Sequence, residues 1–248
     1  HSIAIPPLGC GNGGLEWSHV KREIDASLSG LQEVEVLVYE PTPSYHNAPK
    51  REGLEALTPA RAMVVELVRR YSILGMECTN LEVQKLGWFL QRAIQSLQLN
   101  DPLHLRFEAN KYGPYADSLR HLLDGLDGSF LHCERRLSDA GPFEPIWFEE
   151  SKRESVAEYL KSEDAVPYLP ALEKTSVVIE GFESPLGMEL LATVDWLLSR
   201  EKYAPTIDSI RLGLSKWPGG SAARRKMGIF DDRLIEMALS RLQQATLN

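Results

Sequence analysis

The chain of 248 residues is long enough for one large domain, or for a small domain and a fragment of another. Hydrophobic residues make up 43% and charged residues 25%, which is the balance of an ordinary globular protein and excludes a disordered or fibrous class. Its 27 basic and 35 acidic side chains give a formal net charge of −8. Nonspecific binding along a nucleic-acid backbone is therefore not expected, and an acidic chain more readily meets a basic partner.

The cysteines and histidines predict no metal site. Cys10, Cys78 and Cys133 are an odd number at unrelated spacings, which indicates neither a disulfide framework nor a zinc site. This usage fits a reducing compartment, so we expect a cytoplasmic protein. Three histidines are too irregularly spaced for a metal signature: His104, His121 and His132.

No segment predicts export or insertion into a membrane. The longest apolar runs, such as residues 175–179, fall far short of the roughly 18 residues that cross a bilayer, so we expect no membrane partner. The amino terminus has no initiator Met, basic leader or cleavage site and does not resemble a signal peptide. We interpret the chain as one that begins within a domain.

Residues 1–45 are expected to form part of an α/β domain. An apolar strand at residues 2–5 leads into a glycine-rich turn, and apolar residues then recur at helical spacing over residues 17–28. Gly30 ends this helix, and a β-branched run at residues 34–38 predicts a second strand. A strand, a helix and a strand in this order are typical of parallel α/β sheets.

A helical domain is expected over residues 58–248. Prolines among small and polar residues mark a linker at residues 46–57, and a small helical tail subdomain is an option from about residue 184. Six helix starts are indicated by capping residues or by proline in the first turn: Thr58-Pro59, Thr79 with Glu82, Gly113-Pro114, Ser151 with Glu154, Ser184-Pro185 and Asp231.

Strands are expected to be few in this second domain. Residues 105–107 and 146–148 are candidates for short strands, and nothing indicates a large sheet. The predicted fold class is therefore mainly α, with a helical carboxy-terminal domain preceded by a partial α/β domain.

Four glycines lie within six residues between the first strand and the first helix. Without side chains in the way, the backbone amides of such a loop approach a ligand closely, and the helix that follows directs its positive end to the same place. A diphosphate fits this chemistry. The run matches neither GxGxxG nor a Walker loop, and a glycine-rich turn can also be a simple tight connection.

The whole run of residues 5–17, Ile-Pro-Pro-Leu-Gly-Cys-Gly-Asn-Gly-Gly-Leu-Glu-Trp, resembles the second phosphate-binding loop of macrodomains. It is most similar to the branch that contains the DarG antitoxins and their eukaryotic relatives that remove terminal ADP-ribose. The resemblance covers about residues 2–40 and implies no cofactor, but ADP-ribose as ligand or product, with backbone amides around its diphosphate and distal ribose. The residues expected to bind ADP-ribose are Gly9, Cys10, Gly11, Asn12, Gly13, Gly14 and Leu15.

Two departures from the family limit what this chain is expected to catalyse. Some relatives have an acidic residue at the position of Gly13, and a glycine cannot act as acid, base or nucleophile. The resemblance also implies that the family's catalytic lysine lies in the half of the macrodomain that this chain lacks. We therefore expect no catalytic residue here and no hydrolysis by the chain alone. The intact parent protein would be a hydrolase, a DNA ADP-ribosyl glycohydrolase.

Two further segments resemble the signatures of the Panacea, or SocA-like, antitoxin domains. Residues 81–90, Leu-Glu-Val-Gln-Lys-Leu-Gly-Trp-Phe-Leu, and residues 107–115, Phe-Glu-Ala-Asn-Lys-Tyr-Gly-Pro-Tyr, have the same order and approximate spacing. Taken with the loop upstream, the domain order is that of DarG. For the individual side chains a structural role is preferred, as core for Leu86, Phe89, Leu90 and Phe107 and as a helix start for Gly113-Pro114.

The resemblance implies that the helical domain neutralises a DarT-like toxin, an ADP-ribosyltransferase that modifies thymidine in single-stranded DNA. Such an enzyme needs a basic groove that stacks bases, and an acidic domain with exposed aromatic residues could occupy the groove by DNA mimicry. The candidate toxin-binding residues are Trp147, Glu149, Glu150, Lys111 and Tyr112. Solvated loops explain these charges equally well.

Two other functions are compatible with the sequence. The chain could hydrolyse ADP-ribosylated DNA by itself, which the missing lysine disfavours. Alternatively, Arg224-Arg225-Lys226 beside Trp217 could make the protein a DNA-binding regulator with a winged-helix-like tail. The acidic composition disfavours this alternative.

Overall fold

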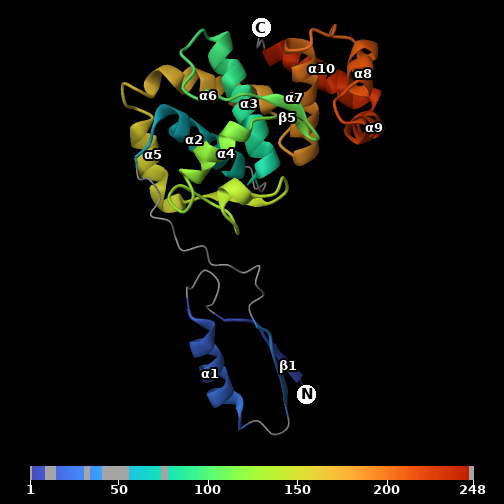
Figure 1. Cartoon of the computed structure of the whole chain (residues 1–248). Helices are drawn as coiled ribbons and strands as arrows, with labels where there is room; N and C mark the ends of the chain where they lie inside the picture. The colour runs from blue at the N-terminus through green and yellow to red at the C-terminus, as the bar shows by residue number, and fades with distance from the viewer. Residues whose placement is uncertain (1, 9–14, 31–33, 41–55, 74–77, 246–248) are drawn as a thin grey trace. The chain divides into compact units, whose positions relative to one another are not determined.

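The computed structural model describes residues 2–8, 15–30, 34–40, 56–73 and 78–245. These residues form two compact units, one within residues 1–51 and one within residues 52–248 (Figure 1). Ten α-helices and seven short strands lie in the described ranges, so the predicted mainly α class is confirmed. None of the helices found there is long and apolar enough to cross a membrane.

The first unit is a strand, a helix and a parallel strand, as predicted. β1 (Ser2–Ile5) and β2 (Glu35–Val38) pair in parallel along their whole length. Between them in the chain lies α1 (Trp17–Leu28), which buries Ile24, and β1 buries Ile5. The helix therefore has an apolar side to pack, while most of the strand positions stay accessible.

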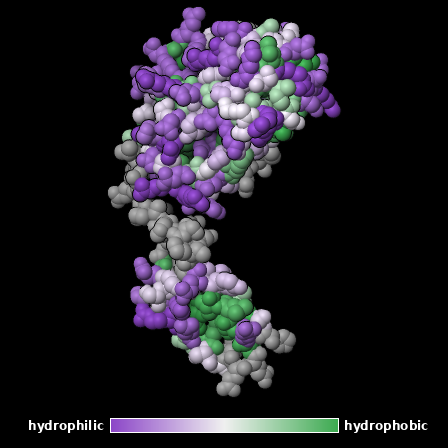
Figure 2. Space-filling view, turned by 45° about the vertical axis from the view of Figure 1, so that its right-hand side comes forward, coloured by the Kyte–Doolittle hydropathy of each residue, from purple (hydrophilic) through white to green (hydrophobic). Residues whose placement is uncertain are grey.

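Large apolar side chains are exposed on the first unit. They are Ile3, Leu8, Leu15, Leu37 and Tyr39. Figure 2 shows an apolar area on this unit, in green. Two strands and one helix offer little surface against which such side chains can be buried. The predicted glycine turn at residues 9–14 and most of the predicted linker at residues 46–57 lie outside the described residues.

The second unit packs around α3 (Asn80–Ser96). This helix contacts α2 (Pro59–Ile73), α6 (Leu169–Ile179) and α7 (Pro185–Ser199). Burial extends beyond the predicted apolar side and includes polar residues, which must then be satisfied by other protein groups. Four of them have such hydrogen bonds: Glu82, Gln84, Lys85 and Gln91.

Short antiparallel strands accompany these helices. β7 (Pro145–Phe148) pairs with β3 (Cys78–Thr79) on one side and with β6 (Leu131–His132) on the other, which confirms the strand predicted there. β4 (Glu108–Asn110) and β5 (Gly113–Tyr115) form a separate hairpin. The sheets of this unit are therefore small, as expected.

Two predictions around the hairpin are wrong. The strand expected at residues 105–107 begins only at Glu108. Gly113-Pro114 does not begin a helix, because both residues lie in β5 and α4 (Asp117–Asp124) starts after them. The φ of Gly113 is +95°, which lies in the left-handed region and cannot continue into a right-handed helix.

Four more helices complete the second unit. They are α5 (Arg153–Tyr159), α8 (Ile207–Ser215), α9 (Gly220–Ile229) and α10 (Asp232–Ala245). Short 3-10 helices cover Leu137–Asp139, Glu150–Lys152 and Val166–Tyr168. α10 contacts α6, α7 and α8, and α9 contacts α8. Because α7 also contacts α3, the residues from 184 onward share a core with the preceding helices.

Most predicted helix starts have the expected capping bonds. The side chains of Thr58, Ser184 and Asp231 each accept a hydrogen bond from the backbone N–H three residues later, at 3.4, 3.1 and 2.8 Å. The Glu82 carboxylate accepts one from the Thr79 N–H at 2.7 Å, which is the reciprocal half of the predicted capping box.

The capping box predicted from Ser151 and Glu154 is wrong. The Glu149 side chain accepts a hydrogen bond from the Ser151 N–H at 3.3 Å, so Ser151 lies inside a 3-10 turn. α5 then begins at Arg153 without a side-chain cap.

Candidate functional site

The ends of β1 and α1 flank the candidate ADP-ribose loop. Six of its predicted binding residues lie outside the described residues: Gly9, Cys10, Gly11, Asn12, Gly13 and Gly14. The seventh, Leu15, directly precedes the cap of α1, and its side chain is exposed. The chain leaves β1 at its carboxyl end and enters α1 at its amino end, which is where parallel α/β units bind anionic ligands.

The amino end of α1 lacks a side-chain cap. Glu16 accepts hydrogen bonds at its carbonyl from His19 and Val20, but its side chain bonds no amide of the first turn. Farther along, Lys21 Nζ lies 2.9 Å from Glu40 Oε1, and this hydrogen bond raises the pKa of Lys21. Both side chains are exposed. The pair therefore connects α1 to the residues that follow β2 at the surface of the unit.

The two signatures of the helical unit are bonded to each other. The Gln84 side chain accepts a hydrogen bond from the Ala116 N–H at 2.9 Å and donates one to the Ala116 carbonyl at 3.2 Å. Lys85 Nζ donates to the Pro114 carbonyl at 2.7 Å. Both side chains are buried, so the signature residues of α3 hold β5 and Ala116, the residue that follows it.

A glycine in each signature permits this close approach. A Cβ on Gly113 would lie 3.0 Å from Thr193 Oγ1 and 3.4 Å from Lys85 Cε, at a φ that side chains rarely adopt. A Cβ on Gly87 would lie 3.3 Å from Leu119 Cδ2. Both positions are therefore constrained by packing.

The structural role predicted for the apolar signature residues is confirmed. Leu86, Phe89 and Leu90 are buried, and Phe107 is partly buried against the core. The ring of Phe107 meets the ring of Trp88 edge-on, with centroids 5.2 Å apart.

A buried charged cluster lies beside the hairpin. Glu189 Oε1 in α7 accepts hydrogen bonds from Lys226 Nζ and Arg225 Nη1 of α9, each at 2.6 Å. Lys226 is 0% exposed, and its burial lowers its pKa although Glu189 opposes the change. Burial lowers the pKa of Lys85 to about 7, and the charge of Lys226 adds to this effect. The cluster therefore places three basic side chains near one carboxylate, which bonds two of them.

This cluster overturns the predicted basic surface at Arg224-Arg225-Lys226. Lys226 points into the protein, Arg225 is half-exposed and bonded to Glu189, and only Arg224 of the three is exposed. Trp217 is buried as well, and its Nε1 donates to the Asn110 carbonyl at 2.9 Å. The sequence run is therefore not a continuous DNA-binding patch.

Lys111 and Tyr112 lie in a group of aromatic and basic side chains at the turn of the hairpin. The rings of Tyr112 and Phe143 are 5.2 Å apart and inclined by 72°. Lys111 Nζ and Arg225 Cζ lie 5.0 and 5.1 Å from the centre of the Tyr112 ring. Phe143 is 53% exposed. We call Lys111, Tyr112, Phe143 and Arg225 the tip cluster.

Trp147 and Glu149 lie in a second accessible group. The Trp147 ring is 41% exposed and stacks on His132, with centroids 6.3 Å apart. His132 Nε2 lies 2.9 Å from Glu149 Oε2. Hydrogen bonds from Ser151, and then from His132, hold the pKa of Glu149 below its usual range. With the neighbouring exposed Glu150, we call His132, Trp147, Glu149 and Glu150 the Trp147 group.

The structure thus divides the predicted toxin-binding residues between two places. Trp147, Glu149 and Glu150 belong to the Trp147 group, whereas Lys111 and Tyr112 belong to the tip cluster. The first group combines an aromatic ring with carboxylates, and the second combines aromatic rings with cations.

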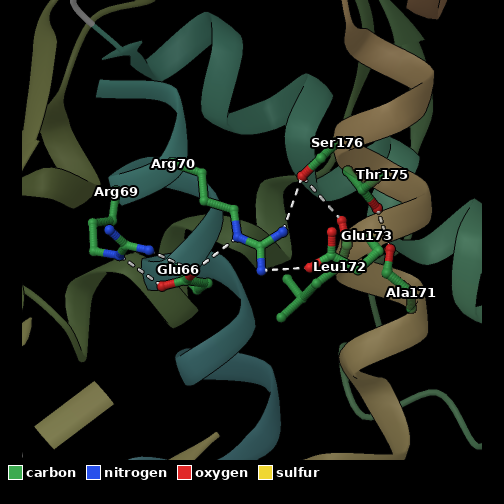
Figure 3. A network of polar contacts seen from close by, with 8 residues as sticks. All are labelled: Glu66, Arg69, Arg70, Ala171, Leu172, Glu173, Thr175 and Ser176. Carbon is green, nitrogen blue, oxygen red and sulfur yellow. Dashed lines mark hydrogen bonds and ion pairs between the residues drawn. The ribbon is translucent and has the colours of Figure 1, made fainter. Parts of the chain in front are cut away.

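Glu66 is the centre of another polar network, which connects α2 to α6 (Figure 3). Its carboxylate accepts hydrogen bonds from Arg69 and Arg70 at 2.8 Å. Burial acts to raise the pKa of Glu66, but these two hydrogen bonds outweigh it and lower the pKa. Arg70 also reaches Ser176 at 3.3 Å and Glu173 at 2.7 Å in α6.

A cavity of about 450 Å³ lies beside this network. Its apolar wall comes from Leu67, Tyr71, Val177 and Ile179. The polar groups that line it already have protein partners: the Tyr71 hydroxyl bonds Glu82, and Arg70, Ser176, Glu180 and Glu183 are bonded within the unit. Nothing in this lining indicates a particular ligand.

Sequence reasoning missed the buried cluster, although a signal was present. Ala222, Lys226 and Phe230 recur every fourth residue, which puts Lys226 on the apolar side of α9. The neighbouring arginines suggested a basic surface instead. Nothing in the sequence singled out Phe143, because its position depends on contacts with distant segments.

No model of a known protein family matches the chain. A DNA ADP-ribosyl glycohydrolase of Thermus aquaticus is 38% identical over 226 residues, which cover 87% of this chain and 57% of the relative. DNA ADP-ribosyl glycohydrolases of Mycobacterium bovis and Mycobacterium tuberculosis are each 33% identical over 256 residues, which cover 97% of this chain and 68% of the relative. The chain therefore spans less than two thirds of the Thermus aquaticus protein and about two thirds of the mycobacterial ones.

Proposed function

Because the chain belongs to the family of DNA ADP-ribosyl glycohydrolases, we propose that it is part of a protein that removes ADP-ribose from DNA. The observation that carries this proposal is the similarity to the mycobacterial relatives over 97% of the chain, which includes both units. The proposed substrate is accordingly ADP-ribosylated DNA.

Within this function we assign ADP-ribose binding to residues 9–15. The assignment is supported by their place between the carboxyl end of β1 and the amino end of α1, whose first turn has no side-chain cap. Free amides and a positive helix end suit a diphosphate, and glycines let the amides approach it. The resemblance of the run to a macrodomain phosphate loop points to the same ligand.

The chemistry that this segment supplies is binding and orientation. Cleavage of the bond to ADP-ribose needs a group that moves a proton or activates water within hydrogen-bond reach. Glycine side chains cannot do this, and we assign no catalytic role to any residue of the chain. When the diphosphate and the distal ribose are held in place, less entropy is lost on the way to the transition state.

Isothermal titration calorimetry with ADP-ribose tests the binding assignment. We expect the chain to bind ADP-ribose and Gly11→Val to weaken binding by about tenfold or more, since a branched side chain blocks amide contacts. Gly30→Val is the matched control, because a Cβ at Gly30 meets nothing within 4 Å. Equal affinity of the two variants, or no heat of binding with the unaltered chain, contradicts the assignment.

Incubation with an ADP-ribosylated thymidine oligonucleotide separates binding from catalysis. We expect the chain to retain the oligonucleotide without releasing ADP-ribose. Release that persists in Gly11→Val would show that another part of the chain carries the reaction.

A second proposed function is inhibition of a DNA ADP-ribosyltransferase by the helical unit. The Trp147 group supports it, because an exposed ring beside two carboxylates, of which Glu149 has a lowered pKa, offers the features of a base beside phosphates. The likeness of the two bonded signatures to Panacea antitoxin domains supports the same partner.

A transferase assay on a thymidine oligonucleotide tests this second function. We expect the chain to inhibit a DarT-like enzyme, and the triple variant Trp147→Ala, Glu149→Gln, Glu150→Gln to raise the inhibitory concentration about tenfold or more. Glu180→Gln, at an exposed ion pair on α6, is the control and should inhibit normally. Full inhibition by the triple variant would exclude the Trp147 group as the interface.

A further inference from the structure

We propose that the tip cluster of the helical unit binds a single strand of DNA, with a base against the exposed Phe143 ring and phosphates against Lys111 and Arg225. This proposal rests on the proposed function, because the proposed substrate contains DNA. The tip cluster would contact that DNA, and it is far in the sequence from the glycine loop that we assign to ADP-ribose. It concerns only contacts within the helical unit.

The aromatic part of the tip cluster is accessible and held in place. Phe143 follows Pro142, whose carbonyl accepts a hydrogen bond from the Leu81 N–H at 2.8 Å. The carbonyl of Glu144, on the other side of Phe143, accepts one from the Asn80 N–H at 3.1 Å. The first turn of α3 thus fixes the backbone on both sides of Phe143, while the ring itself is 53% exposed. A pre-positioned aromatic ring loses little side-chain entropy when it binds.

The hairpin side of the tip cluster is fixed by α9 and by Trp217, which lies between α8 and α9. Trp217 Nε1 donates to the carbonyl of Asn110, the residue before Lys111. Arg225 is held against the Tyr112 ring while its Nη1 bonds Glu189 at 2.6 Å. Lys111, Arg225 and Phe143 therefore all lie close to the Tyr112 ring, although these residues come from three separate parts of the chain.

The charge around this surface is locally positive in an acidic protein. Lys111 and Arg224 are exposed and Arg225 is partly exposed, whereas Glu189 is buried and accepts from both Arg225 and Lys226. Glu144, next to Phe143, pairs with Arg135 at 3.4 Å. These two carboxylates are therefore paired with cations, and Lys111, together with the accessible part of the Arg225 guanidinium, can still meet a phosphate.

This combination favours single-stranded DNA over an acidic protein segment. Exposed rings flanked by cations bind both the flat face of an unpaired base and the phosphate beside it. An acidic peptide would satisfy the cations alone, and a duplex would keep its bases inside its stack. The exposed Phe143 ring adds a stacking contact for an unpaired base, which a purely acidic segment does not supply.

Fluorescence anisotropy with a labelled, unmodified thymidine oligonucleotide tests the proposal on the full chain. At low salt we expect binding that weakens by about tenfold in Phe143→Ala, because stacking on one aromatic side chain contributes roughly 1–3 kcal/mol per base. Lys111→Gln should weaken binding less and should reduce its salt dependence by about one phosphate contact. Met237→Ala, which removes another exposed large apolar side chain of the helical unit, is the control and should bind normally.

Three outcomes overturn the proposal. Unchanged affinity of Phe143→Ala with its circular dichroism intact excludes stacking on that ring. An equal loss in Met237→Ala shows that the effect is not specific to the tip cluster. Affinity for a polyglutamate peptide equal to that for the oligonucleotide shows that the surface recognises charge alone, as a protein interface would.

The glycine-loop variant separates this proposal from the proposed function. Gly11→Val should bind the unmodified oligonucleotide normally, since the tip cluster does not include the loop. Loss of ADP-ribose binding with retained oligonucleotide binding leaves the tip cluster assignment intact, and the reverse pattern removes it while the proposed function stands.

Discussion

The two units of the chain use their signature residues in opposite ways. In the first unit, Ile5 and Ile24 are the buried apolar side chains among the described residues, and the glycine run is the part that we assign to a ligand. In the helical unit, Gln84, Lys85 and Gly113 are buried and bound to or packed on other protein groups. A specific sequence signature therefore reflects a packing requirement in the helical unit, whereas in the first unit it marks the proposed binding loop.

Charge follows the same division. The side chains of the Lys21–Glu40 pair in the first unit are both exposed, and such pairs contribute little to stability because solvent screens them. The Lys226–Glu189 pair of the helical unit is buried, where removal of one partner leaves an uncompensated charge. Removal of one charged partner should therefore lower the stability of the helical unit strongly, whereas the corresponding substitution in the first unit should change stability little.

Glu189→Ala should have the largest effect on the free energy of unfolding. It leaves Lys226 buried and Arg225 without its carboxylate, which costs about 3–5 kcal/mol. Urea titration followed by near-ultraviolet circular dichroism measures the change. The control is Glu180→Ala, whose carboxylate pairs with Arg241 at the surface and should contribute less than about 1 kcal/mol.

A double substitution sharpens this prediction. If the loss arises from the unpaired charge, Glu189→Met combined with Lys226→Met should be less destabilising than Glu189→Ala, since both charges are removed together. A double variant that is the least stable of the set would show that packing, and not charge, explains the loss.

Gly113→Ala should follow, with a loss of about 2–3 kcal/mol. The new Cβ meets Thr193 Oγ1 at 3.0 Å, and alanine at a φ of +95° is strained. Gly228→Ala in α9 is the matched control, because nothing lies within 4 Å of that Cβ and a helical alanine gains up to about 1 kcal/mol over glycine. The same urea titration should therefore give changes of opposite sign. Equal stability of the two variants would contradict the constraint at Gly113.

The stability of the helical unit should rise with pH because of Lys85. Its pKa is about 7 in the folded protein and 10.5 in the unfolded chain, so between these values the unfolded chain binds more protons. The difference in unfolding free energy between the unaltered chain and Lys85→Met should therefore increase by on the order of 2 kcal/mol from pH 7 to pH 9. Below pH 7 the gain in stability that arises from deprotonation of Lys85 in the folded protein is lost. Urea titrations at pH 6, 7, 8 and 9 measure it, and a constant difference would show that Lys85 does not titrate in this range.

Local signals predicted the elements of the fold well. The parallel strands around α1, the capped starts at Ser184 and Asp231, and the apolar side of α2 all follow from residue type and spacing. Gly113-Pro114 was misjudged because its local chemistry fits a helix start, whereas a left-handed φ and contact with Thr193 belong to the tertiary structure.

The candidate sites were harder to predict, because they depend on which distant side chains meet. The positions of Lys111 and Trp147 in the sequence do not indicate which distant side chains lie beside them. Arg225 and Phe143 join the tip cluster, and His132 joins the Trp147 group. The burial of Lys226 likewise depends on Glu189, 37 residues away. Residues 9–14 carry the clearest chemical signal of the chain and stay a prediction.

The smallest effect is expected where the two units are compared directly. Ile24→Ala removes one of the few buried side chains of the first unit, so it should reduce the hydrogen-exchange protection of the α1 amides. Ile3→Ala, at an exposed position of β1, is the matched control and should change protection little. Neither variant should alter protection in residues 78–245, because the helical unit has its own core. A loss of protection there in Ile24→Ala would show that the units fold together and that the contrast between them is not one of stability.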